Sequence, residues 1–157
     1  MADPDDIRGW QRLSSEITTS GKLDPDDVAR LHAIGVRHVI NLALDDHPEA
    51  LRDEAALLEA QGIGYTHIPV AFERPTVDHY LEFREALKSS QGPVHVHCIM
   101  SFRVSAFFYM LHREQGMAGK EAEALMARQW NPLTSEDPRT LPWRDLLMRT
   151  AGSPTGP

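Results

Sequence analysis

The sequence predicts a three-layer α/β fold, in which a central, largely parallel sheet of about four to five strands is flanked by helices. One observation predicts this fold class, and a second predicts the number of domains. Short runs rich in β-branched residues alternate with longer segments whose apolar residues recur at helical spacing. The 157 residues show no internal repeat and no low-complexity linker, and 41% of them are hydrophobic. The sequence therefore predicts one domain over residues 8–150, followed by a disordered tail at 151–157.

The individual elements follow from local signals along the chain. Asp24 offers an oxygen to cap a helix, Pro25 fits the first turn because it lacks an N–H, and Gly35 ends the helix. Thr76 is a second candidate cap, and the pair Gly92-Pro93 turns the chain into a strand. In chain order we expect a strand at 17–21, a helix at 26–33, a strand at 36–42, a helix at 49–61, a strand at 65–70, a helix from 76 to 88, a strand at 94–98, and helices at 102–113, 119–130 and 139–148.

The helix expected at 102–113 is apolar on more than one face, so we expect it to be buried in the centre of the domain. In open parallel sheets, ligands bind beyond the carboxyl ends of the strands. Cys98 lies at such an end, directly before this helix. The sequence therefore places the candidate site at Cys98.

Composition narrows the function classes. Sixteen Lys and Arg against 23 Asp and Glu give a formal charge of −7, which argues against a nucleic-acid or anionic-membrane partner held by bulk charge. A single cysteine excludes an internal disulfide and any multi-cysteine metal site. The acidic N-terminus is unlike a secretory signal, and the longest near-apolar run, at 104–111, is too short to cross a bilayer. We therefore expect a cytoplasmic protein.

The segment around Cys98 carries the expected chemistry. Backbone N–H groups of the loop and of the first helical turn converge with the helix dipole, which makes an anion site. Arg103 adds a planar fork of donors suited to phosphate oxygens. The same field favours thiolate, so Cys98 is expected to be a nucleophile that attacks phosphorus, with no metal or cofactor. The expected phosphate-binding residues are Ile99, Met100, Ser101, Phe102 and Arg103.

The pattern His97-Cys98, four residues, then Arg103 resembles the signature of the protein tyrosine phosphatase superfamily. It is most similar to a bacterial, dual-specificity-like branch with four-residue spacing, in which Asn or Gly often stands at the position of Ser101. Further stretches that resemble this branch are 17–21, 39–42, 67–70, 75–76, 130–132 and 143. The resemblance implies a phosphatase that forms a cysteinyl-phosphate intermediate. Its partner would be a phosphorylated protein or a small phosphomonoester.

The resemblance also implies roles for neighbouring residues. His97 would support the loop, and Ser105 would assist breakdown of the intermediate. The family's general acid is an Asp on the loop after the strand at 65–70, where this chain has Ala71. Glu73 is the nearest replacement and Asp78 the next, and the acid could also be missing altogether.

Two alternative functions remain open at this point, and a metal site is rejected. A pseudophosphatase would bind a phosphorylated partner without efficient hydrolysis; Ala71 favours it, whereas Cys98 and Arg103 count against it. Sulfur or arsenate chemistry could use a similar thiolate loop, although arsenate reduction usually recruits further cysteines. His95 and His97 are spaced so that a strand could present them as a metal pair, but no further ligand cluster accompanies them, so we expect no metal site.

Overall fold

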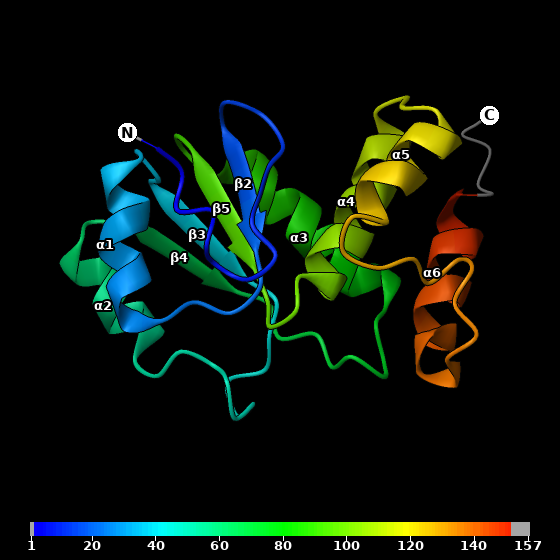
Figure 1. The fold of residues 1–157 in the computed structure, drawn as a ribbon, viewed down its shortest axis with the longest axis horizontal. Coiled ribbons are helices and arrows are strands. Elements are labelled where there is room, and N and C mark those ends of the chain that lie inside the picture. Colours follow the sequence, from blue (N-terminus) through cyan, green and yellow to red (C-terminus); the bar gives the residue numbers. More distant parts are fainter. Residues whose placement is uncertain (1, 152–157) are drawn as a thin grey trace.

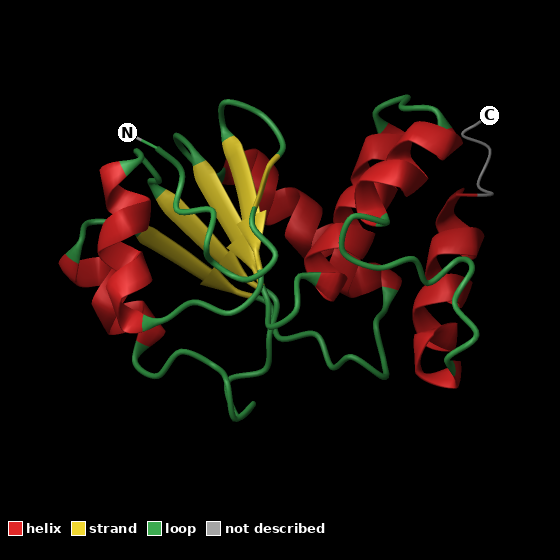
Figure 2. Ribbon diagram, in the orientation of Figure 1, coloured by secondary structure: helices red, strands yellow, loops and turns green. Residues whose placement is uncertain are grey.

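The computed structural model describes residues 2–151, and its centre is a sheet of five strands in the order β1-β2-β5-β3-β4 (Figures 1 and 2). β2, β5, β3 and β4 are parallel, and β1 joins the edge antiparallel to β2. The strands are β1 Gln11–Arg12, β2 Ile17–Ser20, β3 His38–Asn41, β4 Gly64–His67 and β5 Val94–His97. The predicted largely parallel sheet is confirmed.

Helices cover both faces of the sheet. Figure 1 shows α1 and α2 on one side, and α3, α4, α5 and α6 on the other. The helices are α1 Pro25–Ala33, α2 Glu54–Ala60, α3 Val77–Ser89, α4 Phe102–Glu114, α5 Gly119–Met126 and α6 Leu141–Ala151, with a 3₁₀ turn at Pro138–Thr140 before α6. Among the described residues, no helix is long and apolar enough to span a membrane.

Each face of the sheet packs against its own hydrophobic core, because successive strand residues point to opposite faces. On β3, Val39 faces the core shared with α1 and α2, whereas Ile40 faces the larger core formed with α3, α4 and α6. Every residue of α4 from Arg103 to Leu111 is buried. The expectation of a buried central helix after Cys98 is therefore confirmed.

Several predicted boundaries are wrong. The helix expected at 49–61 begins only at Glu54, because Ala50 donates to the carbonyl of His47 and closes a turn there instead. The helix expected at 119–130 ends at Met126, and the one expected at 139–148 is a 3₁₀ turn followed by α6. The two-residue strand β1 was not predicted. The tail expected at 151–157 lies outside the described residues except for Ala151, which ends α6.

Candidate active site

Cys98 lies where the central strand β5 ends and the loop to α4 begins. Its side chain is buried, and its backbone N–H donates to the carbonyl of Ser20 on the neighbouring strand at 3.3 Å. The loop ends at Ser101, which caps α4 with a φ of 67°, in the left-handed region. Gly and Asn adopt this region most readily, which gives a physical reason for their frequency at this position in the related branch.

The loop presents a continuous run of backbone donors. From Ile99 to Val104, no backbone N–H has an acceptor within the described residues. Ser105 is the first residue whose N–H is paired, with the carbonyl of Ser101 at 3.0 Å. The unpaired run combines the three residues that precede α4 with its first turn, where a helix leaves its N–H groups free. A run of unpaired N–H groups of this kind can bind an anion.

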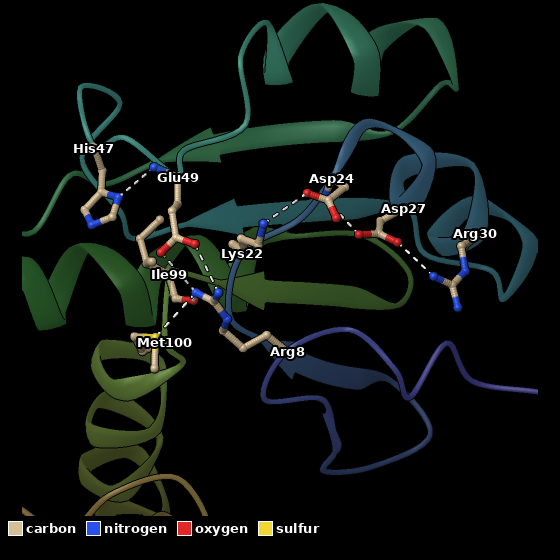
Figure 3. A network of polar contacts seen from close by, with 9 residues as sticks. All are labelled: Arg8, Lys22, Asp24, Asp27, Arg30, His47, Glu49, Ile99 and Met100. Atoms are coloured by element: carbon tan, nitrogen blue, oxygen red, sulfur yellow. Dashed lines mark hydrogen bonds and ion pairs between the residues drawn. The ribbon is translucent and has the colours of Figure 1, made fainter.

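The carbonyl of Ile99 is held on the outside of the loop. It accepts the backbone N–H of Lys22 at 2.8 Å and lies 3.4 Å from Nη1 of Arg8. Figure 3 shows Arg8 reaching both Ile99 and the sulfur of Met100, while it pairs with Glu49. Because the C=O and N–H of one trans peptide point in opposite directions, these contacts turn the N–H of Met100 away from Arg8.

Two further loop carbonyls are held in the same way. Ser105 donates its hydroxyl to the carbonyl of Ser101 at 2.7 Å, which directs the N–H of Phe102 to the other side of that peptide. Nδ1 of His97 lies 3.2 Å from the carbonyl of Cys98, with the same consequence for the N–H of Ile99. The loop is thus held through its carbonyls, and its donors remain unpaired.

Arg103 connects the loop to the segment that follows β4. Its side chain is buried, and Nη1 donates to the carbonyl of Val70 at 2.9 Å. Its guanidinium carbon lies 5.9 Å from the centre of the Phe72 ring, a cation–π distance. Within the described residues, its remaining N–H donors have no acceptor, so the fork can bind an oxyanion as well.

The segment after β4 carries the predicted acid. Ala71 is half-buried, and its carbonyl accepts the N–H of Arg74 in a turn. Glu73 lies on this turn, exposed and without an ion pair to any described residue. Asp78 lies in the first turn of α3, as expected. The structure thus brings the stretch from Val70 to Phe72 against Arg103, and Glu73 follows it directly.

The two histidines of β5 do not converge on a common point. His95 is fully buried, and its two ring nitrogens lie 2.8 Å from the hydroxyls of Thr18 and Ser20. Burial lowers the pKa of His95 well below its ordinary value, so this ring is neutral. His97 instead lies 2.6 Å from Glu54, which the sequence analysis missed. No group of three metal-ligating side chains gathers within residues 2–151.

Aromatic side chains support the outer wall of the loop. Phe102 stacks on Trp130, with ring centres 4.8 Å apart and planes 7° apart. Trp130 also contacts Phe72 and Trp143, and the indole N–H of Trp143 donates to the carbonyl of Phe72 at 2.7 Å. Met100 remains exposed. Phe102 therefore positions the loop, whereas Met100 is available to a bound molecule.

Comparison with known proteins identifies the family and the fold. Residues 9–113 match the family model described as "Beta-lactamase hydrolase-like protein, phosphatase-like domain". A candidate phosphatase from Shewanella putrefaciens CN-32 is 27% identical, with a TM-score of 0.81 over 96% of this chain and 95% of that one. No curated protein matches the chain.

Two more distant structures share the fold. A Cys-to-Ser variant of P. aeruginosa TpbA in complex with phosphotyrosine is 20% identical, with a TM-score of 0.72 over 98% of this chain and 95% of that one. The core catalytic domain of a PP-IP phosphatase from S. cerevisiae is 13% identical, with a TM-score of 0.72 over 89% and 86%. The fold is therefore that of cysteine-phosphatase-like proteins. Because the family model matches most of the chain, including the loop after β5, the chain belongs to the family of phosphatase-like domains of Beta-lactamase hydrolase-like proteins.

Proposed function

We propose that the chain is a metal-independent phosphomonoester phosphatase, of the protein tyrosine or dual-specificity-like type, which acts through a cysteinyl-phosphate intermediate. The observation that carries the proposal is the run of unpaired N–H groups from Ile99 to Val104 beside Cys98. Buried Arg103 adds a positive charge to the same loop. Donors fixed in advance stabilise the charge that develops on the phosphoryl oxygens in the transition state.

The reaction has two displacement steps. The thiolate of Cys98 attacks phosphorus, so that an S–P bond forms, the P–O ester bond breaks and the leaving oxygen takes a proton. Water then attacks phosphorus, the S–P bond breaks, and inorganic phosphate and the thiolate are released. Arg103 and the loop amides bind the equatorial oxygens in both steps.

We assign the proton transfers to Glu73, which donates to the leaving oxygen and then accepts a proton from water. Support comes from the contact of Val70 with Arg103, which holds the start of this segment at the loop. A proton donor contributes roughly 10²–10⁴ in rate. Without one, aryl phosphates, whose leaving groups are good, would be hydrolysed slowly and alkyl phosphates hardly at all.

Ser105 and His97 serve the loop in this proposal. Ser105 holds the carbonyl of Ser101, and so supports breakdown of the intermediate by keeping the N–H of Phe102 on the phosphate side. His97 does the same for Ile99 through the carbonyl of Cys98. Neither residue acts as a proton donor to the substrate.

The substrate class we propose is a phosphorylated protein or a small phosphomonoester. The phosphotyrosine bound to the TpbA variant and the family membership support this class. We place the protein in the cytoplasm, because a lone buried thiol suits a reducing compartment.

A pseudophosphatase is the second candidate. Ala71, at the position of the expected acid, favours it. Such a protein would bind a phosphorylated partner through the same loop without efficient turnover. The two candidates differ in hydrolysis and agree in oxyanion binding.

The test combines hydrolysis of an aryl phosphate with binding of inorganic phosphate. We expect Cys98→Ser to lower turnover of p-nitrophenyl phosphate by at least about a thousandfold, because the nucleophile is lost. Phosphate binding, measured by calorimetry, should persist in this variant and be lost in Arg103→Ala. Binding without turnover in the wild type would identify the pseudophosphatase, and equal turnover in wild type and Cys98→Ser would rule out the cysteinyl intermediate.

A further inference from the structure

A buried imidazole lies between two oxygen atoms directly behind the loop. Nε2 of His97 lies 2.6 Å from Oε2 of Glu54, and Nδ1 lies 3.2 Å from the carbonyl oxygen of Cys98. The side chains of His97 and Glu54 are 3% and 4% exposed. Water is therefore excluded from the pair, and the two contacts decide how the ring is protonated.

Both of these oxygens are hydrogen-bond acceptors when Glu54 is ionised. A neutral imidazole has one N–H and one lone pair, so it can donate to only one of them. The lone pair would then face the other oxygen, which is repulsive. An imidazolium donates to both, and its charge compensates a carboxylate that could not be buried without a partner.

The carboxylate of Glu54 is itself held in place. Its second oxygen, Oε1, accepts Nδ2 of Asn41 at 3.2 Å. The same nitrogen lies 3.1 Å from the hydroxyl of Tyr65, and Oδ1 of Asn41 accepts the N–H of Ala43. Residues from β3, β4 and β5 thus fix the first residue of α2 against the strand that carries the nucleophile.

The other titratable groups nearby do not compete for this proton. His95 stacks at 6.3 Å from His97, but both of its nitrogens are paired with hydroxyls and it is neutral. Burial raises the pKa of Tyr65 to about 12, and the charge of Glu54 adds to the rise. Tyr65 therefore stays protonated at neutral pH. Among the described residues, Glu54 is the only ion-pair partner of His97.

We propose that Glu54 is a positioning residue for the nucleophile loop: it keeps His97 doubly protonated, and His97 then holds the carbonyl of Cys98 so that the N–H of Ile99 faces the bound phosphate. The inference rests on the proposed function of the loop. Removing the negative charge leaves the imidazolium buried without a counter-ion. The ring then loses the proton on Nε2, and Nδ1–H holds the carbonyl of Cys98 without the help of a positive charge, so the first donor of the loop is directed less firmly.

The test uses Glu54→Gln, which keeps the shape of the side chain and removes its charge. Glu59→Gln is the matched control, because Glu59 is on the same helix but exposed. ¹⁵N spectra of the His97 ring at pH 7 should show both nitrogens protonated in the wild type and in Glu59→Gln, and one in Glu54→Gln. A purely structural role of Glu54 would not change the number of ring protons.

Turnover of p-nitrophenyl phosphate gives the second measurement. Losing a whole oxyanion donor lowers kcat by about 10²–10³, so a donor that is only directed less firmly should lower kcat of Glu54→Gln by a smaller factor, roughly threefold to tenfold. KM should change by less than about threefold, because the effect lies mainly in the transition state. Glu59→Gln should behave like the wild type in both parameters.

Two results would overturn the inference. A wild-type His97 with a single ring proton contradicts it directly, and this measurement does not depend on the folding of any variant. Wild-type kcat in a folded Glu54→Gln contradicts the positioning role. If the wild type does not hydrolyse aryl phosphates at all, the proposed function fails, while the ring protonation of His97 still reports on the Glu54 pair separately.

Discussion

Ser101 has a backbone conformation that few residues with a side chain adopt, and it is fully buried. A left-handed conformation costs an L-residue roughly 1–2 kcal/mol. Its neighbour across the fold is Gly9, where an added Cβ would lie 2.9 Å from the Cβ of Ser101. Only small side chains fit at this contact, so the conformation of the four-residue loop requires a small residue at both Ser101 and Gly9.

Single residues also determine which group donates a proton to the leaving oxygen. With Glu73 as acid and then base, we expect Glu73→Gln to lower kcat for aryl phosphates by roughly tenfold or more and to abolish one limb of the pH–rate profile. Asp78→Asn is the control, because Asp78 lies on the adjacent helix α3. An unchanged profile in Glu73→Gln would remove Glu73 from the mechanism.

Ala71 offers the complementary experiment. An Asp at this half-buried position would follow directly after Val70, whose carbonyl is bound to Arg103. In the Glu73→Gln background, where the proposed donor is removed, we therefore expect Ala71→Asp to raise turnover of alkyl phosphates, which need a proton donor most, by roughly tenfold or more. Ala71→Asn, which has the same shape without the acid, should show no gain. Comparison of kcat for an alkyl and an aryl phosphate tests this.

The sequence could predict the residues whose role is local. Cys98 and Arg103 belong to one strand–loop–helix segment, so their spacing alone predicts that they meet. Glu54 and Arg8 act on the loop across many intervening residues, and each is a common surface residue type with no local pattern. Their roles arise from tertiary packing, which a single sequence does not reveal.

At the scale of elements, the turn after β2 and the loop after β5 are in close contact. The carbonyl of Ile99 accepts the N–H of Lys22, and a Cβ on Gly21 would lie 2.3 Å from that carbonyl oxygen. Two adjacent parallel strands therefore end in loops that fit only because one of them has no side chain at this point.

Gly21→Ala should disturb the loop through this contact. The new Cβ would displace the carbonyl of Ile99, so we expect kcat/KM for p-nitrophenyl phosphate to fall by roughly tenfold or more. We expect the free energy of unfolding to fall by about 1–3 kcal/mol. Gly119→Ala is the control, because its Cβ would meet only the side chain of Arg113 at 3.7 Å. The control should be neutral or stabilising by up to about 1 kcal/mol.

Initial rates and thermal denaturation measure the two effects. Wild-type rates and phosphate affinity in Gly21→Ala would show that the position of the Ile99 carbonyl does not matter to the site.

Element boundaries show where sequence reasoning fails. The start of α1 was predicted correctly, because Asp24 and Pro25 are strong local signals. The start of α2 was not, because the Ala-rich and Glu-rich segment continues a helical pattern through a turn that tertiary contacts close. In the structure, Glu49 pairs with Arg8 instead of starting a helix.

At the scale of the whole molecule, the formal charge of −7 opposes an anionic substrate. The loop attracts it only at short range, through its amides and Arg103. We expect kcat/KM for p-nitrophenyl phosphate to rise with ionic strength between about 10 mM and 150 mM, by less than about threefold, because salt screens the repulsion. An enzyme that steers anions to its site would show a steep fall.

The control reaction is alkylation of Cys98 by neutral iodoacetamide in the same salt series. Its rate should stay nearly constant, because the reagent has no charge to repel. A steep decrease of kcat/KM with salt would show that local positive charge outweighs the net field.

The position of β5 between β2 and β3 also has a consequence for folding. Thr18 and His95, which form a hydrogen bond between neighbouring strands, are 77 residues apart in the chain. Contacts over such distances form late and make folding slow. Until β5 is inserted into the sheet, Cys98 is not buried and the backbone amides of its loop are not yet arranged around it. A newly made chain therefore exposes its only thiol for the slowest part of folding, and the yield of active protein should depend on a reducing medium during that time.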